Sequence, residues 1–466
     1  MGGRVVASIG CSTNPSGLRR AQLCVSADRV KVVHISTSDN NGGAARAAYR
    51  IHSSLRRLGA ESSMFVAQRS SDDPHVATFE PPVDLTHRVL RRLRRTLLNW
   101  DASRSGATRL IDRVWFSDDR TQHGSAPSDQ IPAGDILHLH WVARFIDYGA
   151  FFSAVPQHSR LVWTLHDMGA LTGGCHCDLG CGKYVERCGA CPLLGSGDPG
   201  DLSRQIWQRK SAALGKIADG DLHVVTPSRW LADTAKRSAL FGRFPISIIP
   251  YGIDTGTFAP RDRQLARAVL GLPEAGKVIL FVADYIGDER KGFPLLMQAL
   301  KGLSSVTNDL VLISVGNAAP ANKLPFPHFH LGYIRHDGLL SLIYSAADIF
   351  VTPTQQDNFP NTVLESLACG TPVVGFAVGG VPDMVRPGIT GWLAPAEDVA
   401  ALRQAILDAL AHDVLRREMA GNCRRVAEKE YGLEVQARAY LALYRDILGE
   451  NCGRQEFQAA SGGSLS

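Results

Sequence analysis

Short apolar runs that end in polar residues alternate with helical patterns along the chain. Val30 to Ile35 is such a run, and polar residues 36–43 separate it from good helix formers at 44–58. Similar strand-like runs recur at 135–140, 161–166 and 222–226. Because strands that alternate with helices build a parallel sheet, this pattern predicts a doubly wound α/β domain.

A second series of apolar runs follows a polar connection that contains Pro260, Arg261 and Arg263. The predicted strands of this series are 278–282, 310–315, 328–331, 349–352 and 373–376, and the predicted helices are 293–303, 339–346 and 361–369. The chain is therefore predicted to form two α/β domains that meet near residues 250–275.

These patterns also predict domain boundaries. The expected parts are a flexible leader at 1–29, a first domain at 30–255, a second domain at 256–430, a C-terminal helix at 431–452 that could pack back on the first domain, and a disordered tail at 453–466.

Composition and charge narrow the class of protein. The 466 residues are 45% hydrophobic, which is enough for two ordinary cores. The formal net charge of +5 is too small to indicate a nucleic-acid partner. No apolar run approaches the roughly 20 residues that span a bilayer, and the first 30 residues lack the apolar core of a secretory signal. We therefore expect a cytoplasmic protein.

The segment from Thr352 to Val374 carries the most informative chemistry. Asp357 falls in the loop after a predicted strand, and Glu365 lies eight positions later, in a helix that begins near Asn361. The free amide groups at such a helix start favour anionic or hydroxyl-rich ligands. The two carboxylates are thus predicted to reach different parts of one polyhydroxylated ligand, with helix capping as the alternative.

This segment carries a family resemblance. Asp357, seven spacers, Glu365 and the run Ser-Leu-Ala-Cys-Gly-Thr-Pro-Val-Val resemble the E-x(7)-E signature of retaining family 4 glycosyltransferases, with Asp in the first position. The resemblance implies the GT-B fold, in which two Rossmann-like domains face each other across a cleft. It implies that Glu365 binds the nucleotide ribose, that Asp357 faces the donor sugar, and that the sugar hydroxyls are bound by Asn358, Phe359, Pro360 and Asn361.

The same resemblance assigns a diphosphate clamp to Lys291 and Arg290, because a departing diphosphate needs cations. The family arginine usually lies several residues upstream, where this chain has Tyr285, so Arg290 is expected to replace it. A solvated charge pair is the alternative. Gly316 and Asn317 end a predicted strand and are expected near the nucleotide base.

The first domain supplies further candidates. Gly42 and Gly43 follow a predicted strand, where small residues let the backbone approach a phosphate or sugar, although a tight turn would use them equally well. By resemblance, His166 contacts the donor sugar near its reacting centre. His138 and His140 are expected to be structural, one facing inward and the other outward.

Five cysteines crowd into one stretch of the first domain. Cys175, Cys181, Cys188 and Cys191 could hold a structural zinc ion, although their spacing matches no common zinc finger. Disulfides and reduced packing cysteines are the alternatives. The resemblance places such a loop on the structural or acceptor side of the cleft.

Residues 87–100 form a candidate basic amphipathic helix. Leu90, Leu93, Leu97 and Trp100 fall close to one face, and arginines occupy five of the ten other positions. This pattern suits an anionic membrane surface, where a lipid-linked acceptor would lie, and an ordinary surface helix is the alternative.

Together these features predict a retaining, metal-independent glycosyltransferase that moves a hexosyl group from a nucleoside diphosphate sugar to a glycan, with a lipid-linked intermediate of cell-surface polysaccharide as the expected acceptor. The residues assigned to catalysis are His166, Asp357, Lys291 and Arg290. No cofactor is expected to be required, because no Asp-x-Asp motif ends a predicted strand. The alternatives are a GT-B epimerase or hydrolase of nucleotide sugars, and a protein that binds nucleotide sugars or glycans without turnover.

Overall fold

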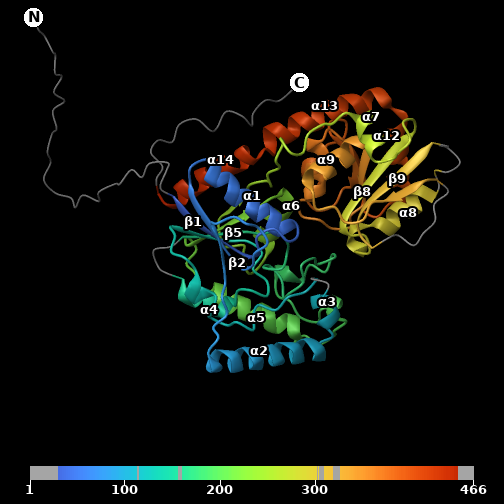
Figure 1. Ribbon diagram of the computed structural model, residues 1–466. Helices are drawn as coiled ribbons and strands as arrows, with labels where there is room; N and C mark the ends of the chain where they lie inside the picture. The colour runs from blue at the N-terminus through green and yellow to red at the C-terminus, as the bar shows by residue number, and fades with distance from the viewer. Residues whose placement is uncertain are drawn as a thin grey trace, which may run out of the picture.

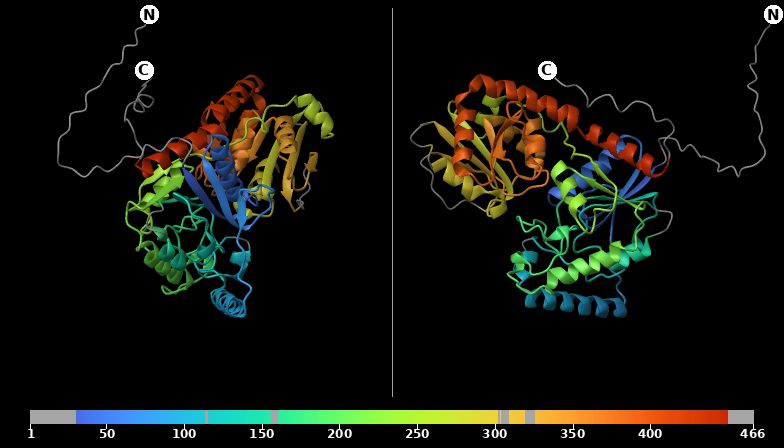
Figure 2. Two further views of the ribbon diagram at one scale, coloured as in Figure 1. Left: turned by 60° about the vertical axis from the view of Figure 1, so that its left-hand side comes forward. Right: turned by 180° about the vertical axis from the view of Figure 1, so that it is seen from behind.

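Two parallel sheets organise the chain into two α/β domains that lie side by side (Figures 1 and 2). The computed structural model describes residues 30–449 except 113–114, 156–159, 302, 304–308 and 319–325. The predicted leader and tail lie outside the described residues. Among the described residues, no helix combines the length and the apolar character that crossing a bilayer requires.

The first sheet has seven strands in the order β3-β2-β1-β4-β5-β6-β7. Its strands are β1 (Lys31–Ser38), β2 (Glu61–Gln68), β3 (Val76–Thr78), β4 (Ile136–Leu139), β5 (Arg160–Thr164), β6 (Leu222–Thr226) and β7 (Ile246–Ile248). Its helices are α1 (Gly43–Arg57), α2 (Leu85–Arg104), α3 (Thr108–Asp112), α4 (Tyr148–Ala154), α5 (Leu202–Leu214) and α6 (Arg229–Arg237). The strand order reverses between β1 and β4, and such a reversal opens a crevice at the carboxyl ends of the strands.

The second sheet has six strands in the order β10-β9-β8-β11-β12-β13. Its strands are β8 (Lys277–Tyr285), β9 (Leu310–Asn317), β10 (His328–His330), β11 (Ile349–Thr352), β12 (Val373–Phe376) and β13 (Gly391–Ala394). Its helices are α7 (Arg263–Val269), α8 (Phe293–Lys301), α9 (Asp337–Ala346), α10 (Asn361–Ala368), α11 (Val381–Met384), α12 (Val399–Ala411) and α13 (Asp413–Glu430). All recorded strand pairs are parallel, which confirms the predicted pair of doubly wound domains.

The last helix, α14 (Leu433–Ile447), returns to the first domain (Figure 1). Its buried face packs into an apolar cluster with Val32 and Ile51. The chain passes between the domains twice at one place, where the Ile253 amide donates to the Tyr431 carbonyl at 2.7 Å. Two tyrosines of α14 also enter the first core, where Tyr444 Oη lies 2.7 Å from His138 Nδ1.

The predicted division of His138 and His140 between two faces is wrong. Both side chains are buried, and their ring centroids lie 4.1 Å apart. Residues two positions apart on a strand project from the same face, so alternation places the two imidazoles side by side.

Replacing Tyr444 with Phe tests how firmly α14 is held. The hydroxyl is the partner of a fully buried imidazole nitrogen, so its loss should lower the free energy of unfolding by about 1–3 kcal/mol. Urea unfolding measures the change. Tyr285→Phe removes a half-exposed hydroxyl and is the matched control. An equal loss in both variants would contradict this account of α14.

Candidate functional site

A cavity of about 1090 Å³, counting space open to solvent, lies between the two domains. The turn before α1 contributes Gly42 and Gly43, and the end of β5 contributes His166. The second domain contributes Lys291 and residues at the start of α10. The carboxyl ends of both sheets thus share one cavity, as the strand-order reversal predicts.

Lys291 and Asp357 form the charged centre of this cavity. Lys291 Nζ lies 2.6 Å from Asp357 Oδ2. Burial alone would lower the pKa of Lys291, but the Asp357 carboxylate outweighs it and raises the pKa. The next residue must be glycine, because Gly292 has φ +74° and an added Cβ would lie 1.7 Å from the Pro353 carbonyl oxygen. The Lys-Gly pair therefore delivers a permanent cation to the cavity.

Glu365 lies on α10, lines the same cavity and is almost fully buried. Tyr344 Oη donates to its Oε2 at 3.0 Å. Arg50 of α1 reaches across from the first domain to within 3.9 Å of Oε1. Burial raises the pKa of Glu365 to about 7, although Arg50 and Arg46 oppose this shift. The carboxyl group is therefore poised to change charge when a ligand arrives.

The loop before α10 joins the domains through its asparagines. Asn361 Nδ2 donates to the Gly43 carbonyl at 3.1 Å, and Arg50 donates to Asn361 Oδ1 at 3.3 Å. Asn358 Nδ2 donates to the His166 carbonyl at 3.2 Å, and its Oδ1 accepts from Ser228 at 2.7 Å. Phe359, Pro360 and Asn361 line the cavity, whereas Asn358 is not among the described residues that do so.

His166 is held from both sides of its ring. Its Nδ1 lies 2.6 Å from Tyr251 Oη, and its Nε2 lies 3.1 Å from His140 Nδ1. Burial lowers the pKa of His166 to about 4, so the imidazole is neutral at physiological pH.

The structure does not bring Arg290 to the cavity. Its guanidinium donates to Asp288 at 2.7 Å, lies 3.3 Å from Cys177 Sγ and stacks on Trp115. Gly316 and Asn317 end β9 but are likewise absent from the described lining. At Gly316 an added Cβ would lie 2.1 Å from the Ala283 carbonyl oxygen, so packing explains this glycine. Like Asn358, these three predicted ligand contacts are not among the described residues that line the cavity.

Sequence reasoning missed Arg50, Tyr251 and Tyr344. Arg46 and Arg50 are four positions apart on α1, so one face of this helix presents both toward the second domain. The four-residue spacing of these arginines could have indicated a basic helix face in the sequence. Tyr251 lies in the interdomain connection, and nothing in its local sequence indicates that its hydroxyl reaches His166.

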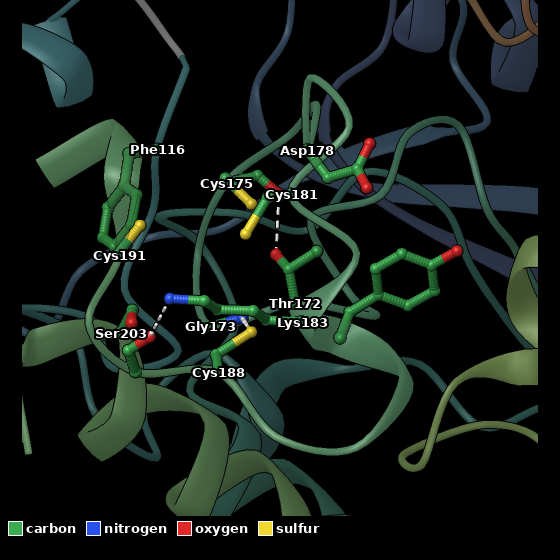
Figure 3. Close-up of a pocket in the computed structure, with 12 residues that line it drawn as sticks. Phe116, Thr172, Gly173, Cys175, Asp178, Cys181, Lys183, Cys188, Cys191 and Ser203 are labelled. Atoms are coloured by element: carbon green, nitrogen blue, oxygen red, sulfur yellow. Dashed lines mark hydrogen bonds between the residues drawn. The ribbon is translucent and has the colours of Figure 1, made fainter. Parts of the chain in front are cut away.

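The cysteine loop forms a separate small pocket, shown in Figure 3. Cys175, Cys181, Cys188 and Cys191 all line it. Burial raises the pKa of the Cys188 thiol to about 11, and the Gly173 amide donates to its sulfur. Within the described residues, one group of three His, Cys, Asp or Glu side chains has its potential metal-ligating atoms within 4.8 Å of one another. This group is His34, His138 and His140. The sulfur atoms of the four cysteines are not grouped closely enough in this structure to form such a set, and the zinc site stays a prediction.

Comparisons with known proteins show what the chain is similar to. Residues 276–412 match the family described as Glycosyl transferases group 1. Over 245 residues the chain is 30% identical to D-inositol 3-phosphate glycosyltransferase of Kribbella flavida, covering 48% of this chain and 57% of that protein. It is 32% identical over 235 residues to the enzyme of that name from Mycobacterium tuberculosis (strain H37Ra), covering 45% of this chain and 46% of that protein. The chain thus spans about half the length of the curated relatives it matches.

Solved structures resemble the whole two-domain arrangement. Sucrose-phosphate synthase from Thermosynechococcus elongatus has a TM-score of 0.62 at 20% identity, with 91% of this chain and 100% of that chain covered. Anabaena HepE in complex with UDP-glucose has a TM-score of 0.57 at 15% identity, with 90% and 100% covered. The fold is therefore the predicted GT-B fold. The match to the glycosyl transferases group 1 family over residues 276–412 agrees with the family resemblance found in the sequence.

Glu365 gives the site a measurable pH dependence. Its folded pKa of about 7 exceeds the ordinary 4.5, so its contribution to stability is full below pH 4.5 and is lost as the pH rises through 7. E365Q lacks this titration. Its stability relative to the unchanged protein should therefore rise by about 3 kcal/mol between about pH 4.5 and pH 8.

Urea unfolding at several pH values checks this expectation. The difference between the two proteins isolates Glu365, because both contain the same buried histidines. The exposed Glu274, replaced by Gln, is the matched control. A pH-independent difference for E365Q, or an equal slope for the control, would show that burial does not hold a proton on Glu365.

Proposed function

We propose that this chain is a retaining glycosyltransferase that moves a hexosyl group from a nucleoside diphosphate sugar to a glycan acceptor, in the synthesis of a cell-surface polysaccharide. The observation that carries the proposal is the Lys291–Asp357 pair within reach of one interdomain cavity that also contains His166 and Glu365. Two further facts support it, namely the glycosyltransferase names of the curated relatives and the UDP-glucose complex of a structural neighbour.

In this proposal Lys291 binds the diphosphate that leaves the donor. Asp357 balances the lysine charge in the free protein, so an arriving diphosphate exchanges partners with it and does not meet a bare cation. As the bond to the sugar breaks, negative charge grows on the diphosphate, and a fixed ammonium stabilises that state more than the bound donor. Arg290 is not included in this role, because its guanidinium pairs with Asp288 and it is not among the described residues that line the cavity.

Glu365 binds the nucleotide ribose in this proposal. Ribose hydroxyls donate to a carboxylate, so their arrival favours loss of the proton that burial retains. Arg50 then balances the new charge from the first domain. Donor binding and domain contact would be linked through this one carboxyl group.

A screen of UDP-, GDP- and ADP-sugars by thermal shift tests the donor class. A donor at about 100 times its dissociation constant should stabilise the protein by roughly 2.7 kcal/mol. Mass spectrometry then measures release of the nucleoside diphosphate with and without a lipid-linked acceptor extract. Acceptor-dependent release supports transfer. Release of free sugar or an epimer without acceptor would indicate the hydrolase or epimerase, and tight binding without release would indicate a binding protein.

Lys291→Ala should lower the rate of acceptor-dependent diphosphate release at least about 100-fold, because the charge that stabilises the leaving group is lost. Lys301→Ala, an exposed lysine at the end of α8, is the matched control and should keep the rate. Weaker donor binding in the Lys291 variant with no change in rate would contradict the assigned role.

We further propose that α2 docks the protein on an anionic membrane that carries the acceptor. Six exposed apolar side chains of α2 fall within an arc of roughly 140° at 100° per residue. They are 42–75% exposed and comprise Leu85, Val89, Leu90, Leu93, Leu97 and Trp100. The helix holds six arginines and one acidic residue, and it lies at the outer edge of the first domain (Figures 1 and 2). An uncovered apolar stripe beside arginines matches the headgroup region of anionic lipids.

Flotation with vesicles of phosphatidylglycerol or phosphatidylcholine tests this surface. Binding should favour the anionic vesicles and weaken with salt. The double change Leu93→Glu and Leu97→Glu should reduce binding at least about 10-fold, because two charges enter the apolar stripe. Val414→Glu, at a similarly exposed apolar position on α13, should bind normally. Equal binding by all variants, or a dimer in solution that the double change disrupts, would contradict membrane docking.

A further inference from the structure

A continuous chain of four side chains runs from the buried core of the first domain to the cavity. Tyr251 Oη lies 2.6 Å from His166 Nδ1, and His166 Nε2 lies 3.1 Å from His140 Nδ1. His140 Nε2 then lies 2.9 Å from Nδ1 of His34, on the adjacent strand β1. We call this the Tyr251–His34 chain. Its cavity end is Tyr251, and its other end is fully buried.

The three imidazoles are neutral. Burial lowers the pKa of His166 to about 4, and it also lowers the pKa values of His140 and His34 well below the ordinary range. A neutral imidazole has one N–H and one bare nitrogen, so each ring can donate on one side only. All the N–H groups of the Tyr251–His34 chain must therefore point the same way, either toward His34 or toward the cavity.

The buried end decides the direction. Among the described residues, His34 Nε2 has no hydrogen-bond partner. If the N–H groups pointed toward His34, its Nε2–H would be a buried donor without an acceptor, which native proteins rarely contain. If they point toward the cavity, His34 donates from Nδ1 and only a bare nitrogen is left unpaired. This second arrangement is favoured.

The direction of these hydrogen bonds determines what the Tyr251 hydroxyl can do. With the chain pointing outward, the Nδ1–H of His166 donates to Tyr251 Oη, so the tyrosine hydrogen is free to donate into the cavity. The tyrosine ring is fixed at an edge-to-face distance of 5.6 Å from Phe359 of the second domain. Its hydroxyl is therefore presented at a fixed place between the domains.

We propose that Tyr251 is a substrate-contacting residue that donates its hydroxyl hydrogen to a phosphate or sugar oxygen of the donor, and that His140 and His34 are positioning residues that keep His166 in its Nδ1–H form. The substrate class rests on the function proposed above. A metal at His34, His138 and His140 is the weaker assignment, because His138 pairs with Thr164 and Tyr444 and the other two rings pair within the chain.

The first test needs no activity. Nitrogen NMR of the ¹⁵N-histidine-labelled full chain shows which ring nitrogen carries hydrogen, with signals assigned by single substitutions. The proposal requires Nδ1–H in His34, His140 and His166. Nε2–H forms in these rings would overturn it, whatever the protein is found to catalyse.

The second test uses turnover. Tyr251→Phe should lower kcat/KM for the donor by about 5–30-fold, the effect of losing one buried hydrogen bond. His34→Leu should lower kcat/KM about fivefold and shift His166 toward Nε2–H, whereas His34→Asn, whose amide can donate near the position of Nδ1, should restore both to within about twofold.

His52→Leu is the matched control, because His52 is equally buried beside His34 but pairs with Ser62 outside the chain. It should keep the His166 form and the kcat/KM value even if it lowers the melting temperature. Loss of activity in His34→Leu with His166 unchanged in the spectrum, or an equal loss in His52→Leu, would show that His34 acts through stability alone. Absence of turnover in every protein, with the outward chain intact, would count against the proposed function and not against the direction of the chain.

Discussion

Polar groups enclosed between two sheets must find partners, and in this protein many find them in the opposite domain. The Asn358 amide connects Ser228 and the His166 carbonyl, and the Asn361 amide connects Gly43 and Arg50. Since an unpaired buried polar group costs about 1–3 kcal/mol, the buried Asn358 amide favours the approach of the domains at which its hydrogen bonds form. The loop before α10 makes these interdomain contacts and also lines the cavity.

Five of the six strands of the second sheet were predicted, because buried parallel strands are continuous apolar runs, and β13 was missed. The predicted 349–352 and 373–376 coincide with β11 and β12. Strand β2, whose serines interrupt its apolar residues, escaped detection, as did the three-residue strand β3. Local patterns thus identify continuous apolar strands better than strands that polar residues interrupt, although the edge strand β10 was also predicted.

Lys291 was assigned through the family resemblance of its Lys-Gly motif. The structure explains the glycine of that motif, because only glycine fits beside the Pro353 carbonyl. The direction of a long side chain has no such signature. Arg290 follows Asp288 by two positions and turns to it, and Arg50 finds Glu365 more than 300 residues away. Pairing across domains depends on the assembled fold, which no local stretch of sequence encodes.

The double passage of the chain between the domains has a mechanical consequence. The connection after β7 and the link between α13 and α14 run side by side and share the Ile253–Tyr431 hydrogen bond. Two parallel tethers at one edge resist sliding and separation but permit rotation about the line on which they lie. The two connecting segments therefore act as a hinge, and the cavity can open by rotation about this hinge while the Ile253–Tyr431 hydrogen bond stays in place. If the backbone were cut in one of the two connecting segments, the two domains would still be joined through the other segment.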